Sequence, residues 1–392
     1  MPYQALITEK SQKRGERMGK HLVLAGGGHA HMVTLANIRL LRDLGHQVTV
    51  IGPSEHHYYS GMGPGMLGAT YEPKDIRFAT KQLVEEQDGA FICDSIVGID
   101  PEIRRLHLAS GQAVDYDVVS FNTGSGIDLP KIVGDDATIY TVKPIERLYE
   151  ARQQIKVQAE DHAVTIGVVG GGPAGSEVAG NLCQLVSKIK TIHPKTKISL
   201  FAGHRFMARF PEKVRSKSRQ LLEENGVLIH EYGYLQSIKD NTLIFDCGIT
   251  EHADFIILAT GVHPSPFFRQ AGIAGGADGG LLVNRYLQSP HYPEIFGGGD
   301  CISFEPHPLD KVGVYAVREN PILFHNLKAY LQGEELIPFD PGGDYLLIFN
   351  LGNGQGVLRK KWLFWSGTLA FKIKDWIDKK FMARFQGGKQ QG

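Results

Sequence analysis

Residues 164–180 read VTIGVVGGGPAGSEVAG, and this stretch decides the fold. The apolar run before the glycines predicts a strand, and Gly170, Gly172 and Gly175 complete a GxGxxG turn that opens a helix. Such a turn lets the backbone approach a pyrophosphate, whose charge is met by the N-terminus of the helix. The stretch therefore predicts a dinucleotide-binding βαβ unit.

The same element occurs earlier in the chain, where residues 21–33 read HLVLAGGGHAHMV. Gly26 and Gly28 predict the turn, and apolar residues at helical spacing predict one helix from there to Leu41. His31 stands where Gly or Ala usually allows close packing of the helix on the strand. The chain thus repeats one nucleotide-binding element, with a less regular copy first.

Three further turns extend the pattern. Strands ending in Thr123-Gly124 and Thr260-Gly261 close the two copies, and Gly299-Asp300 ends another short strand. Single glycine-rich turns are common, but these motifs in this order are hard to obtain by chance. From about residue 20 to 385 the chain resembles the pyridine nucleotide-disulfide oxidoreductase superfamily of two-dinucleotide flavoproteins.

Within that superfamily the chain resembles three groups most: type II NADH dehydrogenases, sulfide:quinone reductases and a flavoprotein domain attached to some selenophosphate synthetases. The last resemblance rests on GGGHAH (26–31), YSGMGPG (59–65) and KDWID (374–378). It implies an α/β fold with two Rossmann-like domains, the NAD(P)-binding domain inserted into the FAD-binding domain. The boundaries that we expect are a disordered extension over 1–19, with Met18 as an alternative start, FAD-binding parts over 20–150 and 266–345, and the NAD(P)H-binding domain over 151–265. A C-terminal membrane-interface segment over 346–392 is expected to include an amphipathic helical tail.

The resemblance implies that the first turn holds FAD. Asp300 corresponds to the family aspartate that accepts a hydrogen bond from the ribityl chain, and the next helix points its positive end at the flavin. The second strand ends at Gly52 instead of an acid, so Glu55 is the candidate for the adenosine ribose, with a solvated loop carboxylate as the alternative. The FAD contacts expected on this basis are Gly26, Gly28, His29, Ala30, His31, Glu55, Thr123, Gly124, Gly299 and Asp300.

The second turn is expected to hold NADH or NADPH. Its strand ends without the acid that NAD enzymes commonly carry, and His204 and Arg205 follow, so NADPH is at least as plausible as NADH. A vestigial nucleotide fold, as in sulfide:quinone reductases, stays open. The expected contacts are Gly170, Gly172, Pro173, Ala174, Gly175, Glu177, His204, Arg205, Thr260 and Gly261.

Two residues are candidates for chemistry beside the flavin. Glu177 resembles a family glutamate near the nicotinamide and the flavin, although a carboxylate favoured by the helix dipole fits equally well. Tyr59 lies in a loop that runs beside the isoalloxazine in the family, although a core tyrosine fits equally well. Histidines near the first turn are explained as hydrogen-bond donors, and we expect no metal site.

The composition of the chain excludes several classes of protein. Lys+Arg and Asp+Glu both number 42, so no overall charge favours nucleic acid. The four cysteines form no CxxC, which excludes the dithiol of disulfide reductases and fits a reducing cytoplasm. No apolar run is long enough for a transmembrane helix.

The C-terminal segment over 356–392 is basic and apolar. Leu369, Ile373, Trp376, Ile377, Phe381 and Phe385 recur at helical spacing with Lys or Arg between them. This pattern predicts an amphipathic helix at the inner face of a membrane. The alternative is a helix that packs on the protein's own core or on a partner in a homodimer.

These observations lead us to expect a monotopic NAD(P)H:quinone oxidoreductase. The segment Ala316-Val317-Arg318 matches the region that lines the quinone entrance in type II NADH dehydrogenases, without their usual signature. One alternative is oxidation of sulfide or a selenium compound with a quinone as acceptor. Another is a nucleotide-sensing flavoprotein that acts by recruiting partners.

Overall fold

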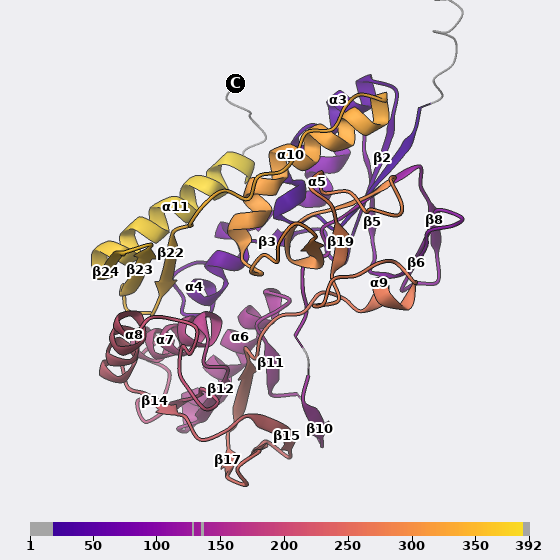
Figure 1. The fold of residues 1–392 in the computed structure, drawn as a ribbon. Coiled ribbons are helices and arrows are strands. Elements are labelled where there is room, and N and C mark those ends of the chain that lie inside the picture. The colour runs from indigo at the N-terminus through magenta and orange to yellow at the C-terminus, as the bar shows by residue number, and fades with distance from the viewer. Residues whose placement is uncertain (1–18, 128, 135–136, 387–392) are drawn as a thin grey trace, which may run out of the picture.

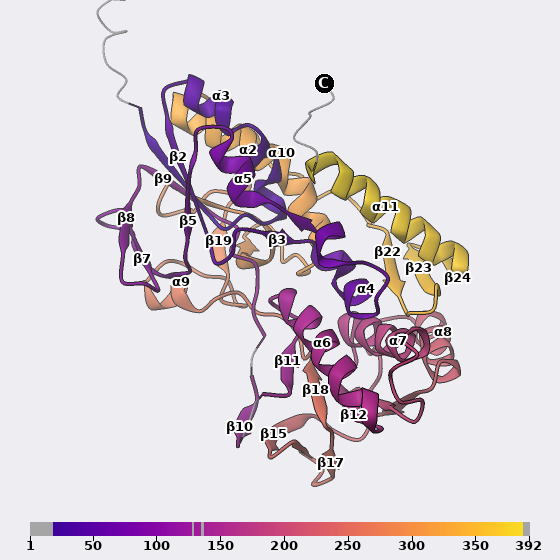
Figure 2. The ribbon, with the colours of Figure 1, turned by 180° about the vertical axis from the view of Figure 1, so that it is seen from behind.

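Two α/β halves make up the chain, each built on a five-stranded parallel sheet (Figures 1 and 2). The computed structural model describes residues 19–127, 129–134 and 137–386. The expected disordered extension over 1–19 therefore lies outside the described residues, apart from Gly19. The two sheets confirm the expected α/β fold with two Rossmann-like halves.

The first sheet has the order β20-β9-β1-β2-β5. Its strands are β1 (His21–Ala25), β2 (Gln47–Gly52), β5 (Ala90–Cys93), β9 (Val118–Phe121) and β20 (Ile295–Gly297). The central strands β1 and β9 are mostly apolar and are buried along nearly their whole length, because helices cover both faces of the sheet. β20 pairs with β9 but lies far beyond it in sequence. The first sheet therefore contains strands that precede the second sheet in the chain and one strand that follows it.

The second sheet has the order β11-β18-β12-β13-β14. Its strands are β11 (Ile139–Thr141), β12 (Thr165–Val169), β13 (Lys197–Phe201), β14 (Val227–His230) and β18 (Phe255–Leu258). All of them lie in sequence between β9 and β20. The exact domain boundaries expected from the sequence stay a prediction.

Five smaller sheets accompany the two parallel sheets in the described part of the chain. They comprise β3 (His57–Tyr58) with β4 (Arg77–Phe78); β6 (Ile96–Asp100), β7 (Arg105–Leu108) and β8 (Ala113–Asp115); β10 (Lys131–Val133), β15 (Leu235–Lys239), β16 (Thr242–Phe245) and β17 (Thr250–His252); β19 (Leu281–Val283) with β21 (Ile302–Phe304); and β22 (Leu347–Asn350), β23 (Gly356–Lys360) and β24 (Leu363–Gly367). The last sheet carries the C-terminal helix.

The helices are α2 (Met32–Ala36), α3 (Ile38–Asp43), α4 (Gly63–Leu67), α5 (Thr80–Glu85), α6 (Glu146–Asp161), α7 (Pro173–Lys188), α8 (Glu212–Glu224), α9 (Phe267–Gln270), α10 (Gly313–Gln332) and α11 (Thr368–Gln386), with short 3-10 turns at 29–31, 60–62, 73–75 and 299–301. α10 packs on α2, while α7 contacts α4 and β22. In the described part of the chain, no helix is both long and apolar enough to cross a membrane.

One expectation about a helix was wrong in detail. The single helix expected to reach Leu41 is broken at Asn37, whose side chain Nδ2 donates to the Val33 carbonyl at 2.7 Å. The expected C-terminal helix is confirmed as α11, and β22, β23 and β24 precede it in the chain. α11 (yellow in Figures 1 and 2) runs along one side of the molecule and packs on these strands and on β4.

Candidate functional site

The glycine turn after β1 is fixed by contacts with two neighbouring strand ends. Gly26 has φ +97°, and a Cβ there would come 2.3 Å from the Asn122 carbonyl O, so only glycine fits. The Asn122 side chain accepts the Ala30 N–H at 3.2 Å and donates to the Gly298 carbonyl at 2.7 Å. Asn122 therefore ties together the turns that follow β1, β9 and β20.

A cavity of about 460 Å³ opens over these turns, a size within the usual range for small-molecule sites. It is lined by seven of the residues expected to contact FAD: Gly26, Gly28, His29, Thr123, Gly124, Gly299 and Asp300. Glu55 is not among the lining residues; it is exposed and ion-paired with Lys81 at 2.7 Å. The structure thus brings the glycine turns and Asp300 together and leaves Glu55 outside.

The histidines of the first turn have different surroundings. His31 is fully buried, with Nδ1 2.6 Å from the Gly26 carbonyl O and Nε2 2.8 Å from Ser120 Oγ. Its side chain therefore stabilises the turn and is not among the residues that line the cavity. Burial lowers the pKa of both His31 and His29 to about 4, which keeps both rings neutral. Nε2 of His29 is buried and has no hydrogen-bond partner among the described residues. A buried polar atom of this kind at the cavity wall fits a bound polar ligand.

Asp300 carries a negative charge into the cavity. Its Oδ2 lies 2.7 Å from Lys143 Nζ and 2.9 Å from Ser125 Oγ, and both partners also line the cavity. Burial alone would raise the pKa of Asp300, but Lys143 and Ser125 outweigh it and hold the pKa below its ordinary value. Lys143 and Ser125 were missed in the sequence, because nothing local marks a lysine before Pro144 as a neighbour of Asp300.

The three residues expected at an acceptor entrance have different environments. Ala316 lines the cavity on the first turn of α10, close to Gly313. Val317 is 40% exposed on another face of the helix. Arg318 donates to the backbone carbonyls of Pro341 and Gly343 and so holds that loop. Only Ala316 is brought to the cavity.

The second glycine turn joins β12 to α7. Gly170 has φ +136°, and a Cβ there would lie 2.2 Å from the Ala259 carbonyl O, next to the exposed Thr260 and Gly261. A Cβ on Gly175 would come 1.8 Å from the Gly170 carbonyl O, so α7 packs tightly under the turn. Pro173 starts α7 at a position where its missing N–H costs nothing, and Ala174 follows it, exposed.

Gly172 differs from these glycines, because no described atom beyond Gly172 and its two chain neighbours lies within 4 Å of a Cβ placed there. The space in front of the helix N-terminus is therefore open. The free N–H groups of the first turn and the helix dipole favour an anion at such a place. The turn can hold a pyrophosphate.

Beyond the end of β13, His204 and Arg205 line a surface groove of about 680 Å³. Both side chains are exposed, and Arg215 and Arg219 of α8 line the same groove. Four glutamates also line it: Glu212, Glu223, Glu224 and Glu231. The α8 arginines pair with glutamates of this set, Arg215 with Glu212 and Arg219 with Glu223 and Glu231.

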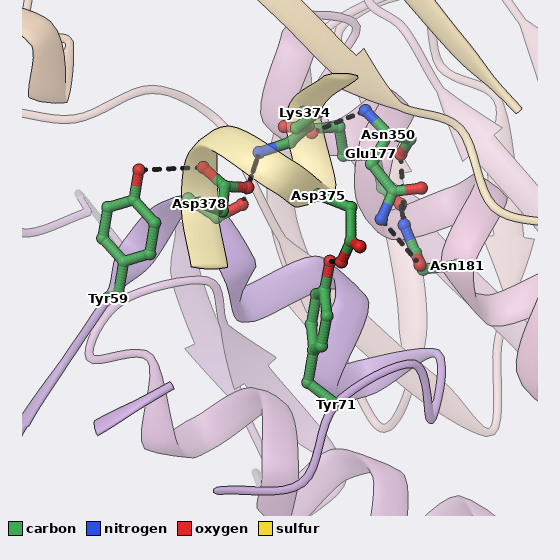
Figure 3. Close-up of polar contacts among 9 residues, drawn as sticks. Tyr59, Tyr71, Glu177, Asn181, Asn350, Lys374, Asp375 and Asp378 are labelled. Atoms are coloured by element: carbon green, nitrogen blue, oxygen red, sulfur yellow. Dashed lines mark hydrogen bonds and ion pairs between the residues drawn. The ribbon is translucent and has the colours of Figure 1, made fainter. Parts of the chain in front are cut away.

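Glu177 and Tyr59 are both half-buried and lie in one polar cluster with residues of α11 (Figure 3). Tyr59 donates to Asp378 Oδ1 at 3.0 Å, and Lys374 Nζ donates to Asp378 Oδ2 at 2.8 Å. Glu177 Oε1 accepts the Asn350 N–H at 2.8 Å. Burial raises the pKa of Glu177 to about 7, although the charge of Lys374 opposes this. No local sequence pattern indicated that Lys374 and Asp378 face inward.

No cysteine is among the residues that line the cavity. Cys301 and Cys183 are buried, and burial raises their pKa values to about 11 and about 12. Both thiols therefore stay protonated and unreactive. Cys93 and Cys247 are exposed.

Known proteins that resemble this chain identify its family. The pyridine nucleotide-disulphide oxidoreductase family model matches residues 20–321. The chain is 24% identical to ferroptosis suppressor protein 1 of Xenopus tropicalis over 358 residues, which cover 86% of this chain and 87% of that protein. It is 26% identical over 144 residues to the internal alternative NAD(P)H-ubiquinone oxidoreductase A1 of Solanum tuberosum mitochondria, covering 35% of this chain and 28% of that one.

Among solved structures, the sulfide:quinone oxidoreductase of Aquifex aeolicus superimposes with a TM-score of 0.74 at 18% identity. The match covers 95% of this chain and 92% of that one. At this identity the similarity establishes the fold alone.

Proposed function

Because the chain belongs to the pyridine nucleotide-disulphide oxidoreductase family and is therefore an FAD-dependent oxidoreductase that uses NAD(P)H, we propose that it passes electrons from NAD(P)H to a quinone. Two of the similar proteins are named for activity on a quinone, and one of these for NAD(P)H as donor. The resemblance of the sequence to type II NADH dehydrogenases points the same way.

The observation that carries this proposal is the composition of the cavity wall. It contains the first glycine turn, Asp300 and the start of α10, and none of its lining residues is a cysteine. An enzyme that passes electrons through a dithiol needs cysteines beside the flavin. Without them, electrons leave the flavin directly for a diffusible acceptor.

The chain's own residues bind and orient the cofactors. FAD, when bound, supplies a centre that accepts a hydride and returns two electrons. Asp300 is held as a carboxylate by Lys143 and can accept a hydrogen bond from a ribityl hydroxyl. Lys143 and the N-terminus of α10 both border the cavity, where their positive charge would favour negative charge on a bound cofactor.

The donor nucleotide would sit on the Gly172 turn, with its adenosine end towards the groove beyond β13. Arg205 lines that groove and can meet a 2'-phosphate. The glutamates of the groove can instead accept a hydrogen bond from a 2'-hydroxyl. We propose that NADPH is used at least as well as NADH.

We also propose that the enzyme works on the cytoplasmic face of a membrane. Trp362, Trp365, Leu369 and Trp376 are between 53% and 89% exposed, while Phe381 and Phe385 of the same apolar pattern pack on the core. Exposed cations accompany the exposed apolar side chains: Lys360, Lys361, Lys372, Lys379, Lys380 and Arg384. Tryptophans among cations suit the headgroup region of an anionic bilayer, where the enzyme would meet a lipid-soluble quinone.

Anaerobic reduction of the bound flavin by NADH, NADPH and sulfide, compared side by side, tests the proposal. We expect fast bleaching by a nicotinamide nucleotide and fast recovery with a soluble quinone. Bleaching by sulfide alone would support the alternative of sulfide or selenium-compound oxidation. A stable charge-transfer complex without turnover would instead support a nucleotide sensor.

A further inference from the structure

A buried carboxyl group lies behind the cavity wall, on the second turn of α10. Glu319 is only 1% exposed, and its Oε2 accepts the Gly299 N–H at 2.5 Å. The carbonyl of the preceding residue, Gly298, accepts a hydrogen bond from Asn122 at 2.7 Å. Glu319 and Asn122 together therefore fix the turn that carries Asp300 into the cavity.

Glu319 is also close to the first glycine turn. A Cβ built on Gly298 would lie 3.1 Å from Glu319 Oε2 and 2.7 Å from the Ala30 Cβ. One residue further along α10, Asn320 Oδ1 accepts the Val33 N–H at 2.7 Å. The Glu319 carboxyl therefore lies beside the residues that directly follow the first glycine turn and open α2.

A negative charge on Glu319 would conflict with the proposed use of the cavity. The pyrophosphate of FAD is an anion, and the first glycine turn is where it would bind. In the described part of the chain Glu319 forms no ion pair, since Lys143 is paired with Asp300 and Lys311 with Asp278. A buried carboxylate without a cation is costly, so its neutral acid is favoured.

Other ionisable groups face Glu319 from three segments: the turn at 29–31, the turn at 299–301 and the chain before α10. They are His29, His31, Asp300, Cys301 and Lys311. Burial lowers the pKa of both histidines to about 4 and raises that of the thiol to about 11, while the pKa of the aspartate is held below its ordinary value.

Glu319 differs from these neighbours. Burial raises its pKa to about 7; the Gly299 N–H opposes this rise, and the charge of Asp300 adds to it. Neither the histidines nor the thiol nor Asp300 changes charge close to neutral pH. Glu319 is therefore the acid of this set that can gain or lose a proton there.

We propose that Glu319 is a positioning residue of the FAD site and that its protonation is coupled to FAD binding. Glu319 is the neutral acid while FAD is bound, and above neutral pH it becomes a carboxylate and releases its proton to water when FAD leaves. In both forms an oxygen of Glu319 can accept the Gly299 N–H, so the turn that carries Asp300 keeps its shape. This inference rests on the proposed placement of FAD over the first glycine turn and does not depend on the electron acceptor.

The coupling predicts how FAD affinity changes with pH. Because a bound anion favours the neutral acid, the pKa of Glu319 is higher with FAD bound than without it. Affinity should therefore be constant below the pKa of the FAD-free protein, about 7, and weaken above it. The Kd for FAD should rise up to about tenfold for each pH unit until the pH reaches the pKa of the bound state.

The test is dilution of the holoenzyme at a series of pH values between about 6 and about 9, with released FAD measured by its fluorescence. Glu319→Gln keeps an oxygen for the Gly299 N–H and stays neutral. We expect its Kd to be independent of pH and, at the alkaline end, about tenfold or more lower than that of the wild type. A purely structural role predicts weaker binding by the variant at every pH, and that result would overturn the proposal.

Glu146→Gln is the matched control, because Glu146 belongs to α6, lines the cavity itself and also has a pKa raised by burial. It should keep the pH dependence of the wild type. Loss of that dependence in Glu146→Gln, with its retention in Glu319→Gln, would assign the proton to the wrong residue and overturn the proposal.

Should Glu319→Gln fold poorly, proton release can be measured on the wild type. FAD that dissociates at about pH 8 in weak buffer should release protons that a pH indicator detects, and release of FAD without protons would also overturn the coupling. Quinone does not enter either measurement. A wild type that shows this coupling but fails to reduce a quinone would refute the proposed function alone.

Discussion

Replacing Gly172 with valine would separate the second nucleotide site from the fold that carries it. The backbone there has φ −91° and ψ −172°, which valine adopts readily. In the described part of the chain, no atom beyond the two chain neighbours lies within 4 Å of the new Cβ. Gly172 is also the N-cap of α7, where valine is less favourable than glycine, so the free energy of unfolding should fall by about 1 kcal/mol. The valine side chain would instead occupy the space in front of the α7 N-terminus.

The cost should fall on nucleotide binding. Displacing a pyrophosphate from two backbone N–H groups would lose two charge-assisted hydrogen bonds, about 1.5–3 kcal/mol each. The total of about 3–6 kcal/mol corresponds to a roughly 10²–10⁴-fold rise in the Kd for NAD(P)H.

The assay is anaerobic flavin reduction by NADH and by NADPH, with dithionite reduction and flavin content measured on the same sample. Gly343→Val, in an exposed loop with open space around its Cβ, is the matched control. Gly175→Ala should behave oppositely and impair folding, because its Cβ would lie 1.8 Å from the Gly170 carbonyl O. Unchanged reduction kinetics in Gly172→Val would refute the placement of the donor on this turn.

Arg205→Ala should raise the KM for NADPH about 10-fold or more and leave that for NADH unchanged, since a 2'-phosphate contact is worth about 1.5–3 kcal/mol; a strong NADH preference in the wild type would contradict this. Asp300→Ala should purify with little flavin because the ribityl contact is lost and Lys143 is left unpaired, and full yellow occupancy would argue against the FAD assignment. Asn122→Ala should lower the free energy of unfolding by about 1–3 kcal/mol, because buried partners on two turns lose their hydrogen bonds; an unchanged melting curve would show that the turns hold without it. Changing Trp362 and Trp376 to serine should weaken sedimentation with anionic liposomes at high salt without affecting flavin content, and sedimentation equal to the wild type would make the patch a packing or dimer surface.

The glycine turns could be predicted because their signal is local. A strand, a glycine at positive φ and a helix start lie within a dozen residues, as at Gly26 and Gly170. Asp300 was also recognisable, since it follows a strand and three glycines. The order of these motifs was enough to predict the two halves and seven of the residues that line the cavity.

The rest of the site depends on contacts that no local pattern records. Lys143 is 157 residues from Asp300, and Tyr59 is 319 residues from Asp378. Lys374 looked like a surface cation of an amphipathic helix because lysines usually are. Its inward position depends on the buried Asp378 one turn later, and only the packing of α11 on the loop around Tyr59 reveals the pair.

The apolar side chains of α11 fall into two groups, one packed on the core and one exposed. Phe381 packs against His29 and Tyr59, with ring centroids at 5.5 and 5.0 Å, whereas Trp376 remains 63% exposed on the other side of α11. Helical spacing alone predicted that all these side chains lie on one apolar face of the helix. The structure assigns part of it to the core and leaves the remainder for the proposed membrane contact.

A single-turnover experiment on the purified holoenzyme tests the central claim most directly. One equivalent of NADPH or NADH, added without oxygen, should bleach the bound flavin, and one equivalent of a soluble quinone should restore its full absorbance with formation of quinol. A flavin that stays oxidised in excess of both nucleotides, or a reduced flavin that quinone does not reoxidise, would contradict the account.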